Sequence, residues 1–177
     1  MNIPNFLTLI RIASIPVVVA VFYLPLHSAP YLTAGLFALA CITDWLDGYL
    51  ARILNQTSAV GAFLDPVADK LLVATCLILL VARSTLPFLA IPTIIIVGRE
   101  IVISALREWM AELGKRASVA VSFLGKLKTG LQMVAIMVLL AFRRGEYPHA
   151  LLLGYLLLYA AAILTLWSMF IYLMPKD

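Results

Sequence analysis

The last long stretch of the chain, Ala150–Met174, contains no charged residue. A helix that crosses a lipid bilayer needs about 20 mostly apolar residues, so this stretch is long enough to span one. Five earlier apolar stretches are each interrupted by only a few charges: Phe6–Leu24, Tyr31–Leu54, Ala62–Val81, Pro87–Leu106 and Val119–Phe142. The sequence therefore predicts an all-α polytopic membrane protein with six transmembrane helices.

The composition supports this class. Of the 177 residues, 64% are hydrophobic and 12% are charged, whereas soluble domains have roughly 45–50% apolar and about 25% charged residues. These values exclude a soluble globular enzyme, a disordered chain and a nucleic-acid-binding protein. The connections between the stretches are short, so we expect a single membrane domain over residues 1–177. The two cysteines, Cys41 and Cys76, lie inside apolar stretches and are expected to be buried thiols rather than a disulfide.

The distribution of basic residues predicts the orientation in the membrane. Six spans place both termini on one side, and most of the Lys and Arg residues fall on that side. Since cytoplasmic segments carry the excess of positive charge, we expect the termini and the connections 53–61 and 107–126 to be cytoplasmic. The first stretch lacks a small-residue cleavage site, so it is expected to be a retained helix rather than a signal peptide. The modest net charge of +4 fits contact with anionic headgroups or a phosphorylated substrate.

Four aspartates interrupt two neighbouring apolar stretches. An aspartate at the centre of a membrane helix costs about 2.5–3.5 kcal/mol, so such residues usually have a function. Asp44 and Asp47 are three residues apart, and Asp65 and Asp69 are four apart, so each pair shares one helix face. The short connection between the two stretches makes them antiparallel neighbours, and their acidic faces can meet. Four carboxylates in one place require cations, and their hard oxygen atoms suit Mg²⁺ or Mn²⁺, with room for two ions.

The residues alone leave three classes of function open. A metal-dependent enzyme is favoured by the four aspartates. A cation transporter also uses carboxylates inside the membrane, but it usually has an internal repeat or broken helices, and neither is evident in the sequence. A non-catalytic lipid-binding or assembly protein would not need all four aspartates.

Residues 44–69 read DWLDGYLARILNQTSAVGAFLDPVAD. The Asp, Gly, Ala and Arg residues of this segment stand at the spacings of the CDP-alcohol phosphotransferase signature, and the segment resembles that family at every signature position. The resemblance extends to the opening NIPNFLTLIR. The segment GREIVISALREWMAELGKRASVAVSFLGKLKT is similar to the bacterial members that make phosphatidylglycerol phosphate. The resemblance implies a six-helix fold in the bacterial inner (cytoplasmic) membrane, usually a homodimer, with a cavity open to the cytoplasm and to the surrounding membrane lipids.

The resemblance also implies a reaction. CDP-diacylglycerol would supply a phosphatidyl group, sn-glycerol 3-phosphate would accept it, and CMP would leave. Because the signature is shared by the whole family, phosphatidylglycerol, inositol phosphate or serine are alternative acceptors. Phosphoryl-type transfer depends mainly on positioning and on neutralising charge, which two metal ions can supply.

Specific roles follow from matching positions in the signature. The resemblance implies that Asp44, Asp47, Asp65 and Asp69 bind two Mg²⁺ or Mn²⁺ ions, and that Asp69 is also the general base that takes the proton of the acceptor. A second group of residues is expected to bind CDP-diacylglycerol: Asn5, Thr8, Gly48, Arg52 and Ser58.

The phosphate of the acceptor needs cations outside the signature. Arg99 and Arg107 can border one cavity from the fourth stretch, and Lys126 opens the fifth stretch at a similar depth, so these three residues are predicted to bind sn-glycerol 3-phosphate. Glu100, next to Arg99, is expected to be a poor partner because adjacent side chains diverge by about 100° around a helix. A further three basic residues are predicted to be surface charges facing the anionic leaflet: Lys115, Arg116 and Lys128.

Overall fold

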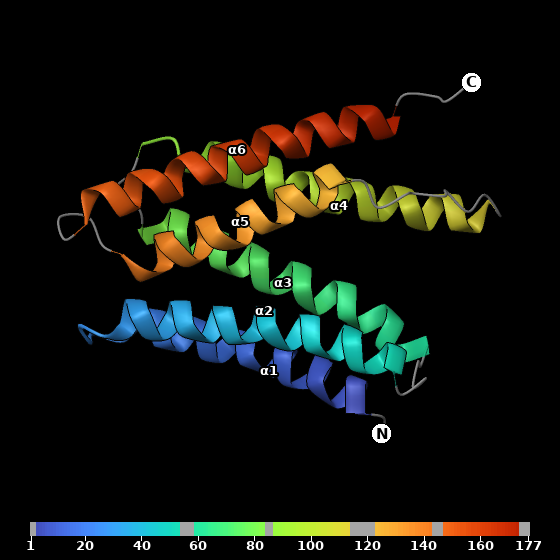
Figure 1. The fold of residues 1–177 in the computed structure, drawn as a ribbon, viewed down its shortest axis with the longest axis horizontal. Helices are drawn as coiled ribbons and strands as arrows, with labels where there is room; N and C mark the ends of the chain where they lie inside the picture. Colours follow the sequence, from blue (N-terminus) through green and yellow to red (C-terminus); the bar gives the residue numbers. More distant parts are fainter. Residues whose placement is uncertain (1–2, 54–58, 84–86, 114–122, 143–146, 174–177) are drawn as a thin grey trace.

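The computed structural model of the chain describes residues 3–53, 59–83, 87–113, 123–142 and 147–173. Within these ranges the chain forms six helices and no strand (Figure 1). The helices are α1 (Ile3–Tyr23), α2 (Ala29–Ile53), α3 (Ala59–Arg83), α4 (Ala90–Glu112), α5 (Phe123–Ala141) and α6 (Pro148–Leu173). The all-α prediction is confirmed for the described residues, and each predicted apolar stretch corresponds to one helix.

Some helix ends differ from the prediction. Helix α4 begins at Ala90 instead of Pro87, because Phe88 has a φ of 63°, and this left-handed conformation cannot continue a right-handed helix. The same helix continues to Glu112, well past the predicted end at Leu106. The extra turns carry Arg107 beyond the packed part of the bundle.

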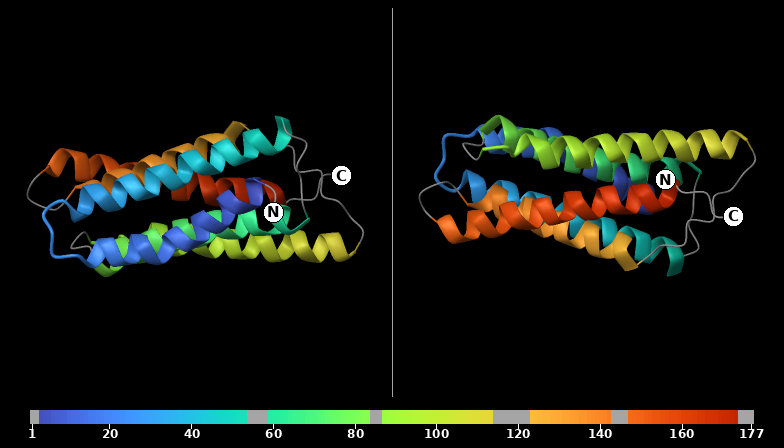
Figure 2. Two further views of the ribbon diagram at one scale, coloured as in Figure 1. Left: turned by 90° about the horizontal axis from the view of Figure 1, so that it is seen from below. Right: turned by 90° about the horizontal axis from the view of Figure 1, so that it is seen from above.

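The six helices run along the long axis and alternate in direction (Figures 1 and 2). The start of α1 and the end of α6 therefore lie at the same end of the molecule. Helix α3 is central, since it packs against α1, α2, α4 and α5. Helix α6 packs against both α4 and α5, whereas the described backbones of α4 and α5 do not approach each other. Helices α4 and α5 therefore each lie against both α3 and α6.

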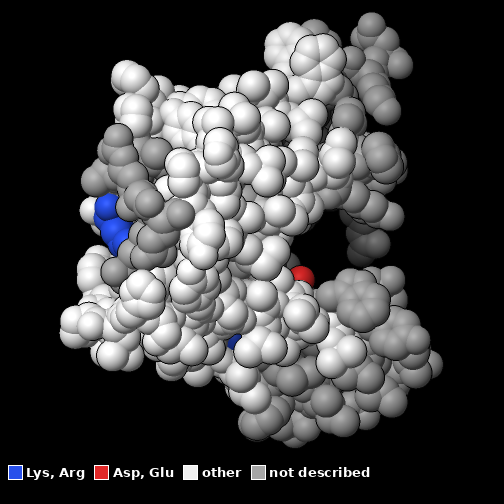
Figure 3. Space-filling view, turned by 60° about the vertical axis from the view of Figure 1, so that its left-hand side comes forward, with Lys and Arg blue, Asp and Glu red and all other residues white. Residues whose placement is uncertain are grey.

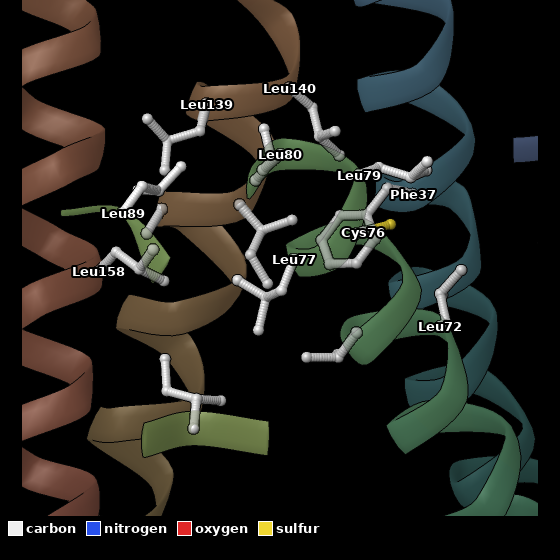
Figure 4. Packing of buried hydrophobic residues seen from close by; sticks show 14 of the residues in the cluster. Phe37, Leu72, Cys76, Leu77, Leu79, Leu80, Leu89, Leu139, Leu140 and Leu158 are labelled. Carbon is white, nitrogen blue, oxygen red and sulfur yellow. The ribbon is translucent and has the colours of Figure 1, made fainter. Parts of the chain in front are cut away.

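The apolar core fills the middle of the bundle around α3. Leu72, Cys76 and Leu77 of α3 pack with Phe37 of α2 and with leucines of α5 and α6 (Figure 4). Both cysteines are free thiols; Cys76 is buried, as predicted, whereas Cys41 is only partly buried. This core begins one turn beyond Asp69, so the dense packing fixes the position of α3 without occupying the end that carries the aspartates.

The outer surface of the bundle is also apolar. Leu39, Ile94 and Ile163 are 60%, 69% and 64% exposed, respectively. Among the described helices, one segment of α6, Pro148–Phe170, is long and apolar enough to cross a membrane. Three shorter apolar segments are Thr8–Tyr23, Ala29–Asp44 and Leu127–Ala141. The predicted number of membrane spans stays a prediction.

Candidate active site

Asp44, toward the end of α2, forms an ion pair with helix α1. The Arg11 guanidinium donates from Nη1 to Oδ1 of Asp44 over 2.5 Å. The Arg11 side chain is 1% exposed and that of Asp44 is 43% exposed. The pair therefore spans from the interior of the bundle to its accessible end. Burying a guanidinium is costly unless a carboxylate neutralises it, so this contact explains how Arg11 is accommodated in an otherwise apolar helix.

Asp65, in the second turn of α3, contacts the same helix one turn earlier. The Thr8 hydroxyl is fully buried and donates a hydrogen bond to Oδ1 of Asp65. Thr8 and Arg11 are three residues apart and so share one face of α1. This face presents one donor to each of the two neighbouring acidic helices. Thr8, predicted to bind the CDP-diacylglycerol donor, is thus placed against a carboxylate of the site.

Asp69 follows Asp65 by one turn and lines a cavity of about 260 Å³ between α3, α4 and α5. It accepts no hydrogen bond from any residue that the structure describes. The space-filling view of Figure 3 shows an acidic side chain (red) at the edge of a hollow in the surface. We call Asp44, Asp65 and Asp69 the acidic side of the site.

The acidic side has the chemistry of a hard-cation site. Among the described side chains, no group of three or more His, Cys, Asp or Glu is close enough to hold a metal ion, and the side chain of Asp47, the fourth expected ligand, lies outside them. Asp69 faces the cavity without a partner in the described part of the chain, and a partly buried carboxylate in that state favours a nearby cation. The residues present therefore fit Mg²⁺ or Mn²⁺ in donor type.

A partly buried cluster of opposite charge joins α4 to α5. Oε1 of Glu100 accepts from Nη1 of Arg99 over 2.9 Å and from Nζ of Lys128 over 3.2 Å. We call Arg99 and Lys128, with Glu100 between them, the basic side of the site. Glu100 also lines the cavity that contains Asp69, so the two sides meet at one space.

This cluster corrects two predictions. Lys128 was expected at the surface, but it is 6% exposed and paired with Glu100, because α5 turns that face toward α4 rather than toward lipid headgroups. Glu100 was expected to be a poor partner for Arg99, but the pair forms, since the long guanidinium side chain reaches around the helix to its neighbour.

Lys70 ties α3 to the same region of α4. Its ammonium group donates to the hydroxyl of Ser104, which in turn donates to the backbone carbonyl of Glu100 over 2.6 Å. Lys70 therefore points toward α4 rather than toward the neighbouring carboxylate of Asp69. This contact fixes the height of α4 against α3 at the level of the cavity.

Of the other predicted site residues, Arg107 has a described side chain, and it makes none of these contacts. Arg107 is exposed on the part of α4 that extends beyond the bundle. Ser58 lies outside the described residues. The remaining predicted residues lie in described helices, but their side chains are outside the described part: Asn5, Asp47, Gly48, Arg52 and Lys126.

Four side chains of the site were not predicted as site residues: Arg11, Glu100, Lys128 and Gln132. Arg11 and Glu100 carry a signal in the sequence, since each is a charge inside an apolar stretch. Gln132 is neutral and lies in a stretch of apolar residues on α5, where a buried amide is indistinguishable from an ordinary helix-packing residue.

The described helices and this pair of charged clusters define an all-helical protein with a carboxylate-lined cavity. The family model for CDP-alcohol phosphatidyltransferase matches residues 1–167, and the chain belongs to that family. Among its relatives are three proteins named CDP-diacylglycerol–glycerol-3-phosphate 3-phosphatidyltransferase. The Haemophilus influenzae protein is 54% identical over 97% of this chain and 91% of its own length. The proteins of Sodalis glossinidius and Escherichia coli are 51% and 52% identical, over 98% and 97% of this chain and 93% of each relative.

Proposed function

We propose that this protein transfers the phosphatidyl group of CDP-diacylglycerol to sn-glycerol 3-phosphate. The observation that carries the proposal is the 51–54% identity over nearly the whole chain to bacterial proteins named for that reaction. The products are phosphatidylglycerol phosphate and CMP. The cavity lined by Asp69 and Glu100 supports the proposal, since Glu100 is itself paired with Arg99 and Lys128, two cations that suit an acceptor phosphate.

The reaction forms one bond and breaks one. The oxygen of an acceptor hydroxyl bonds to the phosphorus that carries the diacylglycerol, and the bond from this phosphorus to the bridging oxygen breaks. CMP leaves with that oxygen. Asp69 is positioned as the general base that takes the hydroxyl proton, since its carboxylate faces the cavity and accepts no hydrogen bond from another described residue. General-base assistance of this kind typically contributes about 10²–10⁴-fold.

Asp44, Asp47, Asp65 and Asp69 would hold two Mg²⁺ or Mn²⁺ ions. Bound there, the ions supply neutralisation of charge on the transferring phosphoryl group. The chain's own part is to orient the carboxylates, and the contacts of α1 support this role. The Arg11 guanidinium and the Thr8 hydroxyl hold Asp44 and Asp65 from one helix face.

The two substrates occupy opposite sides of the cavity in this proposal. Donor binding is assigned to the residues that match the signature and the first helix: Asn5, Thr8, Gly48, Arg52 and Ser58. Arg99, Arg107 and Lys126 bind the acceptor phosphate, and the burial of Lys128 beside Arg99 adds a fourth cation to this group. A guanidinium is suited to phosphate because its planar donors form paired hydrogen bonds.

We further propose that the protein is a single domain of six transmembrane helices in the bacterial inner membrane, with cytoplasmic termini and active site, and that it forms a homodimer. The exposed apolar side chains of α2, α4 and α6 support contact with lipid, since soluble proteins rarely expose large apolar surfaces. The membrane-length segment Pro148–Phe170 supports at least one span. A substrate with two acyl chains would reach the cavity from the bilayer.

The test uses the purified protein with labelled CDP-diacylglycerol and a panel of acceptors: sn-glycerol 3-phosphate, phosphatidylglycerol, inositol phosphate and serine. We expect CMP release and a labelled lipid product with sn-glycerol 3-phosphate alone. Selective use of another acceptor would reassign the substrate while keeping the reaction class. Absence of CMP release with every acceptor, by protein that binds the donor, would contradict the proposal.

A further inference from the structure

Gln132 is a buried polar side chain at the wall of the cavity. It is 6% exposed and lines the cavity together with Asp69 and Glu100. Neither its amide nitrogen nor its amide oxygen has a hydrogen-bond partner among the described residues. These two atoms are not among the buried side-chain atoms that lack a partner, so they open into the cavity, where a ligand can replace the hydrogen bonds that the amide makes to water. Its orientation toward the cavity therefore points to a ligand that supplies those bonds.

The surroundings of Gln132 limit the chemistry of that ligand. The cavity wall includes apolar residues such as Val73, Ile96 and Met133, and its charges come from Asp69, Lys70 and Glu100. A neutral group that both donates and accepts, such as a hydroxyl, satisfies the amide of Gln132 without adding a further charge.

The position of Gln132 relates it to the proposed acceptor. It follows Lys128 by one helical turn, about 6 Å along α5, and it faces the cavity that Asp69 also lines. An acceptor with its phosphate at the basic side and one hydroxyl at Asp69 would place its remaining hydroxyl between them. sn-Glycerol 3-phosphate has this arrangement, with one primary hydroxyl, one secondary hydroxyl and a phosphate.

We propose that Gln132 is a specificity-determining residue that recognises the secondary hydroxyl of the acceptor by hydrogen bonding to it through its side-chain amide. This inference rests on the proposed function. Gln132, a neutral residue on α5, would thus allow the protein to distinguish an acceptor with two adjacent hydroxyls from an acceptor with a single hydroxyl.

The test compares two acceptors in the wild-type protein and in Q132M. 3-Hydroxypropyl phosphate keeps the primary hydroxyl and the phosphate of sn-glycerol 3-phosphate but lacks the secondary hydroxyl. In the wild type we expect kcat/KM to be roughly 10- to 100-fold lower with 3-hydroxypropyl phosphate, because the bound acceptor then lacks the hydroxyl that hydrogen bonds to the amide. In Q132M, which has a similar volume and no amide, the ratio between the two acceptors should fall to within about threefold.

A matched control is T129V, which removes a hydroxyl from the same helix and the same cavity wall. Thr129 already donates to the carbonyl of Gly125, so T129V should keep the wild-type ratio. A wild type that does not distinguish the two acceptors overturns the inference without any variant. A Q132M protein that keeps the wild-type ratio also overturns it. Turnover of sn-glycerol 3-phosphate by the wild type, measured first, separates failure of this inference from failure of the proposed function.

Discussion

The acidic and basic sides of the site balance their charges in opposite ways. On the acidic side, the carboxylates of Asp44 and Asp65 outnumber the cations, and helix α1 supplies the donors Arg11 and Thr8. On the basic side, two cations share the single carboxylate of Glu100. Because buried charges must be compensated, each side keeps an internal partner while it retains a surplus of one sign. The comparison teaches that the two sides, which meet at the cavity lined by Asp69 and Glu100, carry surplus charge of opposite sign.

The largest expected effect comes from removing a carboxylate of the acidic side. D44A and D65A should each abolish activity while the protein still reaches the membrane, because the proposed metal site loses a ligand. Excess chelator should have the same effect on the wild type, with Mg²⁺ or Mn²⁺ restoring CMP release. E108A, at an exposed position of α4, is the control and should remain active. Full activity in excess chelator would contradict the two-metal assignment.

A variant of Asp69 tests proton transfer separately from metal binding on the acidic side. D69N should lower kcat by about 10²–10⁴-fold, because an amide cannot take the hydroxyl proton. The KM for CDP-diacylglycerol should change much less. Metal content must be measured on the same sample, since Asp69 is also an expected ligand. Near-normal turnover with intact metal content would place the general base elsewhere.

Arg99 tests the basic side. R99A should raise the KM for sn-glycerol 3-phosphate by roughly 10- to 100-fold, since hydrogen bonds to charged groups contribute about 1.5–3 kcal/mol. The KM for CDP-diacylglycerol should stay close to the wild-type value. R107A should act in the same direction but more weakly, because Arg107 is exposed and outside the Glu100 cluster. Loss of donor affinity with unchanged acceptor affinity would reverse the assignment of the two sides.

Thr8 gives the smallest of these effects and distinguishes two roles. If its hydroxyl orients Asp65, as the hydrogen bond indicates, T8V should raise the Mg²⁺ concentration for half-maximal activity by roughly tenfold. A change in the KM for CDP-diacylglycerol, at saturating Mg²⁺, would instead support the donor-binding role predicted from the sequence. Valine matches threonine in shape, so packing of α1 against α3 is preserved.

Apolar patterning predicted the six helices because each run is long and clearly bounded. It did not predict the start of α4, since the positive φ of Phe88 depends on how the preceding turn is held. That turn is held from α6: the hydroxyls of Tyr155 and Tyr159 donate to the carbonyls of Pro87 and Phe88 over 2.8 and 3.0 Å. No local pattern in the sequence indicates this contact.

The acidic side was easier to predict than the basic side. The aspartates stand at fixed spacing in one short segment, so helix periodicity alone places each pair on one face. The basic side combines residues of α4 and α5 that are distant in sequence, and the burial of Lys128 depends on Glu100 lying opposite it. The roles of Arg11 and Thr8 likewise required the packing of α1 against both acidic helices.

Helix α6 has no charged residue in its described part, yet it packs against both α4 and α5, whose described backbones do not approach each other. Helix α6 therefore bridges the two walls that carry Glu100 and Lys128, as α3 also does, and it follows both walls in the chain. During synthesis α2 and α3, which carry the four aspartates, emerge before α6. The contacts by which α6 joins α4 to α5 can therefore form only after the aspartate-bearing helices have been made.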